Sequence, residues 1–159
     1  LFRSPLISHF RDEDVFLDIG ANIGSFSITA AVTRRCRTFS IEPFSVNYVE
    51  LLRNIALNKV GDLVTPLNIA ISDKTEAGRL SLASSDIGSA THDFDAGSAP
   101  QASGTGNGQA VQGYRLDDLI SGGQIDFPTH IKIDVDGLEH RIIADRKSTR
   151  LNSSHITNS

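Results

Sequence analysis

One stretch near the start of the chain constrains the fold more than any other part of the sequence. Residues 15–19 are apolar except for Asp18, and a turn with Gly20 and Gly24 follows directly. The run is too apolar for a half-exposed strand and is typical of a central parallel one. A helix is expected from about Gly24 to Arg34. This strand, glycine turn and helix let a ligand approach the backbone at a helix N-terminus.

The glycine turn also indicates which ligand is expected. Asn22 stands where a dinucleotide fingerprint has its second glycine. A carboxylate such as Asp18 fits poorly beside a pyrophosphate but suits a ligand with an ammonium group. Glu42 ends the next apolar stretch and can accept hydrogen bonds from ribose hydroxyls, which fits NAD as well. The first loop therefore favours S-adenosylmethionine, and the predicted cofactor-binding residues in this part of the chain are Asp18, Gly20, Asn22, Gly24 and Glu42.

Further strands and helices alternate along the chain. Ser45 is a suitable N-cap for a second helix, and Gly61 a suitable residue to close it. Pro66 indicates that the third strand begins irregularly or lies at a sheet edge. A short helix capped by Asp117 or Asp118 is expected to start near Leu119. The pattern predicts an α/β fold with an open, mainly parallel, Rossmann-like sheet, whose later strands are expected at 37–41, 64–71 and 131–135.

Composition divides the chain into a domain at 1–145 and a tail at 146–159. Within the domain, 17 of the 31 residues at 83–113 are Gly, Ala or Ser. A lid over an acceptor site is one interpretation of this segment. The composition favours a flexible, loosely ordered insertion, which could include a short hairpin. The tail has two aliphatic residues in fourteen and is expected to be a foreign, disordered appendage.

Charge and hydropathy limit the partners. The net charge is −4, and without the tail 12 basic and 19 acidic residues remain, which gives −7. Such an acidic body argues against nucleic acid as a partner. No apolar run approaches the ~20 residues of a membrane helix. Charge and composition do not themselves identify a small-molecule partner.

Six short motifs together resemble the FkbM-type methyltransferases, and the resemblance covers roughly residues 12 to 144. It implies a class I methyltransferase fold and methyl transfer from S-adenosylmethionine, usually to a hydroxyl of a sugar or other secondary metabolite. That fold has three more strands after 131–135, so the chain is expected to be truncated after its fourth core strand. The motifs are Asp18-Ile-Gly-Ala-Asn-Ile-Gly24, Glu42-Pro43, Asn54-x-x-x-Asn58, Asn68-Ile-Ala-Ile-Ser-Asp73, Leu116-Asp-Asp-Leu119 and Ile131-Lys-Ile-Asp-Val-Asp-Gly-Leu-Glu139.

The resemblance implies a role for each cofactor residue. Asp18 is expected at the methionine end of the cofactor, and Glu42 at the ribose. Asp73 is expected near the adenine amine, although a turn-forming Asp explains it equally well. The structural alternative is that Asp18 caps the glycine turn and Glu42 is merely exposed.

The strand at 131–135 runs into residues that could take the proton of an acceptor hydroxyl. Asp134 and Glu139 are the candidate catalytic bases, with His140 in reserve. The family typically has Glu where this chain has Asp136. The Asp-x-Asp-Gly string lacks the other ligands of a calcium loop, so no calcium site is expected. A metal bound by Asp134 with Glu139 is an alternative that nothing in the sequence supports, and no metal is predicted.

Two hypotheses from different classes follow, with a third behind them. The first is an O-methyltransferase that uses S-adenosylmethionine. The second is a non-catalytic remnant that keeps at most the cofactor contacts. An NAD-dependent oxidoreductase is the third, and Asn22 counts against it.

Overall fold

A computed structural model describes residues 5–82, 92–96 and 108–135 of the chain. In these ranges two four-stranded sheets are built, with the orders β3-β2-β1-β8 and β4-β7-β5-β6. The first sheet is made of β1 (Val15–Ile19), β2 (Arg37–Ile41), β3 (Val64–Leu67) and β8 (His130–Ile133). All three of its pairings are parallel.

The parallel sheet confirms the predicted fold class. All five residues of β1 are buried, as expected of a central strand. It lies between β2 and β8, and Leu17 is paired with both Phe39 and Ile131. β3 is at an edge of the sheet, which suits Pro66 because proline has no N–H to donate to a further strand.

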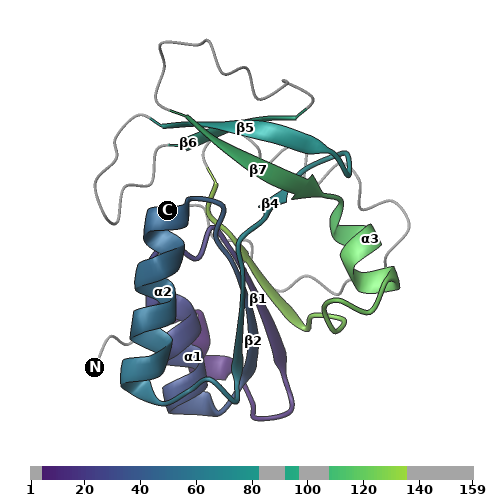
Figure 1. The fold of residues 1–159 in the computed structure, drawn as a ribbon. Helices are drawn as coiled ribbons and strands as arrows, with labels where there is room; N and C mark the ends of the chain where they lie inside the picture. The colour runs from purple at the N-terminus through teal and green to yellow at the C-terminus, as the bar shows by residue number, and fades with distance from the viewer. Residues whose placement is uncertain (1–4, 83–91, 97–107, 136–159) are drawn as a thin grey trace.

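Helices α1 (Ser25–Arg34) and α2 (Ser45–Asn58) connect β1 to β2 and β2 to β3. Figure 1 shows both on one side of the parallel sheet. The predicted ends of α2 were wrong by a residue or two. Phe44 is the N-cap and Ser45 already lies in the helix, while the left-handed Lys59 ends it in place of Gly61. The spacing of Tyr48, Leu52 and Ile55, with Leu51 beside them, predicts this helix. Leu51 and Ile55 are buried on its inner side, whereas Leu52 is exposed.

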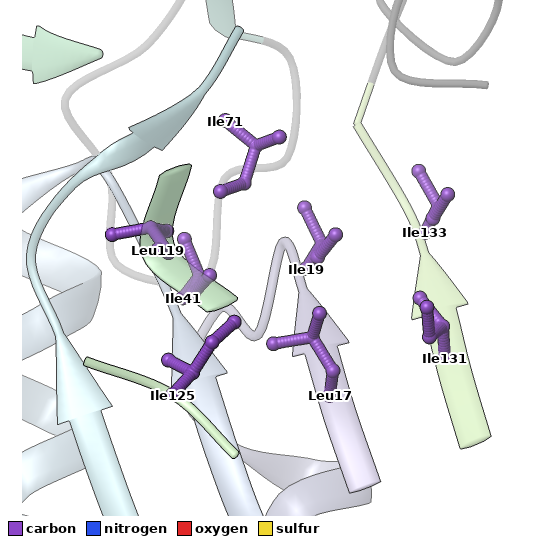
Figure 2. Close-up of a cluster of buried hydrophobic side chains, with 8 residues drawn as sticks. All are labelled: Leu17, Ile19, Ile41, Ile71, Leu119, Ile125, Ile131 and Ile133. Atoms are coloured by element: carbon purple, nitrogen blue, oxygen red, sulfur yellow. The ribbon is translucent and has the colours of Figure 1, made fainter. Parts of the chain in front are cut away.

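Helix α3 (Leu116–Ser121) lies on the opposite side of the parallel sheet (Figure 1). It begins three residues before the predicted start, with Arg115 as its N-cap and both Asp117 and Asp118 in its first turn. Its Leu119 packs into the largest apolar cluster. Figure 2 shows this cluster, whose buried members are Leu17, Ile19, Ile41, Ile71, Leu119, Ile125, Ile131 and Ile133.

The second sheet was not predicted. It contains β4 (Ala70–Ile71), β5 (Ala77–Leu82), β6 (His92–Ala96) and β7 (Gly108–Tyr114). The predicted third strand at 64–71 is thus divided, since β3 pairs with β2 whereas β4 pairs with β7. Parts of the predicted insertion at 83–113 are strands β6 and β7, and its remainder lies outside the described residues.

An aromatic side chain organises this second sheet. Phe94 of β6 lies over two glycines, where a Cβ on Gly78 or Gly113 would come within 2.6 Å or 2.9 Å of its ring. Phe94 is buried together with Leu80 of β5 and Val111 of β7. The glycine-rich composition therefore makes room for a packed ring.

The second sheet lies beyond the carboxyl ends of β1 and β2 (Figure 1). Gln109 of β7 joins it to the segment that follows β2. Its Nε2 donates to the Pro43 carbonyl at 2.7 Å, and its Oε1 accepts from the Ser45 amide at 2.8 Å. Within the described ranges, no helix is both long enough and apolar enough to cross a membrane.

Candidate cofactor site

The strand order defines where a ligand is expected. From β1 the chain crosses by α1 to β2 on one side, whereas β8 lies on the other side of β1. In open parallel sheets, ligands bind outside the carboxyl ends of the strands at such a switch point. Asp18, Gly20, Glu42 and Asp134 all lie at or just after the carboxyl ends of β1, β2 and β8.

Two glycines shape the loop after β1. Gly20 has φ +76°, and a Cβ there would be 2.0 Å from the Asp134 carbonyl oxygen. Gly24 has φ +91°, and its Cβ would meet Leu51 at 2.4 Å. Both positions thus require glycine for backbone geometry and close packing. Cofactor contact by Gly20 and Gly24 stays a prediction.

The same loop is fixed to its neighbours through Asn22. Asn22 itself adopts the left-handed conformation, with φ 53°, which asparagine tolerates better than most residues. Its backbone N–H donates to Glu42 Oε2 at 2.8 Å. Asn54 of α2 donates to the Ile23 carbonyl at 2.9 Å, which holds the loop against that helix. A direct contact from Asn22 to the cofactor stays a prediction.

Glu42 is buried at the end of β2, with 4% of its surface exposed. Besides the Asn22 amide, the Phe44 amide donates to its Oε1 at 2.8 Å. Burial raises the pKa of Glu42 to about 7, although the two amide donors oppose that shift. The exposed-Glu alternative is therefore wrong. A carboxylate held by one N–H on each oxygen keeps lone pairs for further donors, such as hydroxyls.

Asp18 belongs to a buried polar network. Its Oδ2 accepts from Ser27 Oγ at 2.7 Å, and Ser40 Oγ donates to Ser27 Oγ at 2.7 Å. Its Oδ1 accepts from Lys132 Nζ at 3.2 Å. Burial raises the pKa of Asp18, against the opposing effect of the Lys132 ammonium. Asp18 has no exposed surface, so both oxygens are held by internal groups.

Lys132 was not among the predicted site residues. It lies in β8 with 4% of its surface exposed, and its Nζ also forms an ion pair with Asp134 Oδ2 at 3.3 Å. The Gly20 carbonyl accepts from the same Nζ at 3.4 Å. The ring of Phe26 lies 5.0 Å away, within the range of a cation–π contact. A lysine inside the apolar run 131–133 was the sequence signal for this group.

The remaining predicted residues are placed differently from one another. The Asp134 side chain is 49% exposed just after β8, beside the glycine loop. Asp73 is exposed after β4, and Ser72 Oγ donates to it at 3.2 Å. Its place beside an adenine stays a prediction. Glu139 and His140 lie outside the described residues.

An open cleft of about 550 Å³ lies beside the loop and the two helices that cover the sheet. Its lining includes Ile23 of the loop and Phe26 of α1, with Asn54 on the α2 side. In the described part of the chain, no group of three His, Cys, Asp or Glu side chains could hold a metal ion.

Comparison with protein families identifies the chain. The model of the methyltransferase FkbM domain matches residues 18–156. The chain belongs to the FkbM methyltransferase family. This family membership confirms the predicted resemblance and the predicted cofactor, S-adenosylmethionine. Among curated proteins, none matches this FkbM chain significantly.

Two solved structures also resemble the FkbM chain, though only slightly. TYW2 from P. horikoshii in complex with MeSAdo is 26% identical with a TM-score of 0.40, and the match covers 44% of this chain and 30% of that one. A tRNA methyltransferase from M. jannaschii is 22% identical with a TM-score of 0.36, and the match covers 47% and 30%. The chain thus spans about a third of these structures, and likeness at this level carries no argument about substrate.

Proposed function

We propose that this chain transfers a methyl group from S-adenosylmethionine to a hydroxyl of a sugar or other secondary metabolite. Its membership in the FkbM family supports methyl transfer. The observation that carries the assignment to this site is the Glu42 carboxylate, which two backbone amides hold at the carboxyl end of β2. Exclusion of nucleic acid as the acceptor rests on the acidic composition alone and stays a prediction.

The residues at the carboxyl ends of the strands fit this cofactor. Glu42 can accept hydrogen bonds from both ribose hydroxyls. Gly20 and Gly24 let the loop turn at positive φ and pack closely against Asp134 and Leu51, which gives the loop the shape that the predicted cofactor contacts need. The Asp18 and Asp134 carboxylates, balanced by one lysine, leave a net negative charge for a cationic ligand.

When bound, S-adenosylmethionine would supply a methyl group on a positively charged sulfur. An acceptor oxygen in line with the carbon–sulfur bond can take the methyl group, and the neutral thioether leaves. Because the leaving group is already built into the cofactor, the protein's contribution is mainly to position the two reactants. Asp134 and Glu139 stay the predicted groups to take the hydroxyl proton. The acceptor pocket is not assigned.

Calorimetric titration of the 159-residue chain tests this function. We expect saturable binding of S-adenosylhomocysteine and no binding of NAD. Glu42→Ala should weaken the binding. Glu50→Ala is the matched control and should leave the binding unchanged, because Glu50 is a carboxylate on α2 that pairs with Arg53. A folded sample, judged by circular dichroism, that binds neither ligand would refute the cofactor site. Binding of NAD alone would favour the oxidoreductase hypothesis instead.

Methyl transfer itself needs a separate readout. We expect radiolabel from S-adenosylmethionine to enter a hydroxylated acceptor from a panel of sugars and secondary metabolites. Saturable cofactor binding with no labelled product from any acceptor would favour the non-catalytic hypothesis. Label entering tRNA would overturn the predicted exclusion of nucleic acid.

A further inference from the structure

The two carboxylates beside the glycine loop are not equivalent. Asp18 is fully buried, and both of its oxygens accept hydrogen bonds from internal side chains. The Asp134 side chain is about half exposed at the end of the neighbouring strand. The sequence suggested that Asp18 meets the methionine end of the cofactor. Because Asp18 is buried, Asp134 is the more accessible of the two carboxylates.

Lys132 links these two carboxylates. Its ammonium donates hydrogen bonds to Asp18 Oδ1 at 3.2 Å and to the Gly20 carbonyl at 3.4 Å, and it forms an ion pair with Asp134 Oδ2 at 3.3 Å. Its side chain is only 5% exposed, so a ligand reaches it poorly. The ammonium of Lys132 balances the charge of the buried Asp18. The negative charge of the second carboxylate, Asp134, then remains.

The backbone places that remaining charge beside the cofactor loop. Gly20 approaches the Asp134 carbonyl so closely that a Cβ would lie 2.0 Å from it. The Asp134 amide in turn donates to the Ile19 carbonyl at 3.0 Å. Asp134 is therefore fixed against the loop through its backbone as well as through Lys132.

We propose that Asp134 pairs with the ammonium at the methionine end of the cofactor. Lys132 is then a positioning residue, because it holds the Asp134 carboxylate beside the loop and balances the charge of Asp18. The proposal rests on the proposed function. It gives Asp134 a binding role in place of the predicted base, and gives Asp18 a role inside the fold.

Two ligands that differ at the methionine end test this assignment. S-adenosylhomocysteine carries the ammonium, whereas methylthioadenosine has the same nucleoside without it. Asp134→Asn should lower the affinity for S-adenosylhomocysteine about tenfold, which is the usual loss for one charged hydrogen bond. Binding of methylthioadenosine should be unchanged. Glu42→Gln is the matched control. It should lower the affinity for both ligands, because both carry the ribose.

Lys132 is tested without leaving a buried carboxylate unpaired. The double variant Asp18→Asn with Lys132→Met removes both buried charges. We expect it to bind methylthioadenosine like the parent but to lose affinity for S-adenosylhomocysteine, as Asp134→Asn does. A purely structural Lys132 would leave both affinities at the parent's values. If the double variant does not fold, the result with Asp134→Asn still decides the role of Asp134.

The proposal and the function on which it rests fail in different ways. A folded parent that binds neither nucleoside refutes the proposed function, and the ammonium site with it. A parent that binds both ligands, with Asp134→Asn indistinguishable from it, refutes only the ammonium site. If Asp18→Asn selectively loses affinity for S-adenosylhomocysteine while Asp134→Asn binds it like the parent, Asp18 and not Asp134 contacts the ammonium.

Discussion

Glu42 illustrates how a single residue can be prepared for a ligand at a cost to the fold. Its carboxylate lies under the loop and accepts one amide on each oxygen, yet burial raises its pKa from 4.5 to about 7. Near neutral pH the charged form is therefore disfavoured by the surrounding protein. Ribose hydroxyls that donate to this carboxylate would favour the charged form.

The stability of the protein should therefore depend on pH through Glu42. Between pH 4.5 and about 7 the folded state binds more protons at this residue than the unfolded state, so its contribution to stability falls as pH rises. Glu42→Gln lacks this titration. Denaturant unfolding of both proteins from pH 4.5 to 8 should show the parent losing up to about 3 kcal/mol relative to the variant, at about 1.4 kcal/mol per pKa unit. Parallel stability curves would contradict the raised pKa.

The site residues divide into those that the sequence predicts and those that it does not. Asp18 and Glu42 were placed correctly at the ends of their strands, because an acidic residue after a buried run is visible in the sequence. Lys132 was missed because its burial depends on Asp18, 114 residues away. Spacing along the chain carries no information about such a pair.

At the scale of elements, the loop between β1 and α1 depends on close packing against β8. Gly20→Ala would strain a left-handed backbone and also force a Cβ against the Asp134 carbonyl. Gly123→Ala is a matched control, since Gly123 has φ +70° and a Cβ added there would meet no atom within 4 Å. The control should lose about 1–2 kcal/mol of unfolding free energy.

Gly20→Ala should lose several kcal/mol more than this control, since a backbone carbonyl cannot rotate away as a side chain can. Chemical denaturation of the two variants measures the difference. Equal losses would mean that the contact between Gly20 and β8 contributes little, and that backbone conformation alone requires the glycine.

Elements formed by local pattern were predicted better than those formed by distant pairing. The local sequence pattern identified β1, α1 and β2. Pro66 predicted an irregular start or an edge position for the third strand, and β3 does lie at an edge. The pattern missed the division at 68–69 between β3 and β4, since both halves are apolar strands and only their partners differ. β5 and β7 pair across the 25 residues at 83–107, of which 14 are Gly, Ala or Ser, and this composition hid the sheet.

At the scale of the whole molecule, the two sheets meet beside the proposed ribose site. Gln109 of β7 binds both the Pro43 carbonyl and the Ser45 amide, immediately after Glu42. Asn68, between β3 and β4, donates to the Glu42 carbonyl at 2.8 Å and to the Pro43 carbonyl at 3.0 Å. The second sheet thus fixes the backbone that carries Glu42.

Removing this connection should therefore weaken cofactor binding without touching the cofactor. We expect Gln109→Ala to lose about 1–2 kcal/mol of unfolding free energy for its two hydrogen bonds, and to bind methylthioadenosine several-fold more weakly as the segment after β2 loosens. Gln112→Ala is the matched control. It lies on the same strand, but its side chain donates to the Gly113 carbonyl beside it. Calorimetry on both variants separates the two effects, and equal affinities would mean that the second sheet stabilises the fold without positioning Glu42.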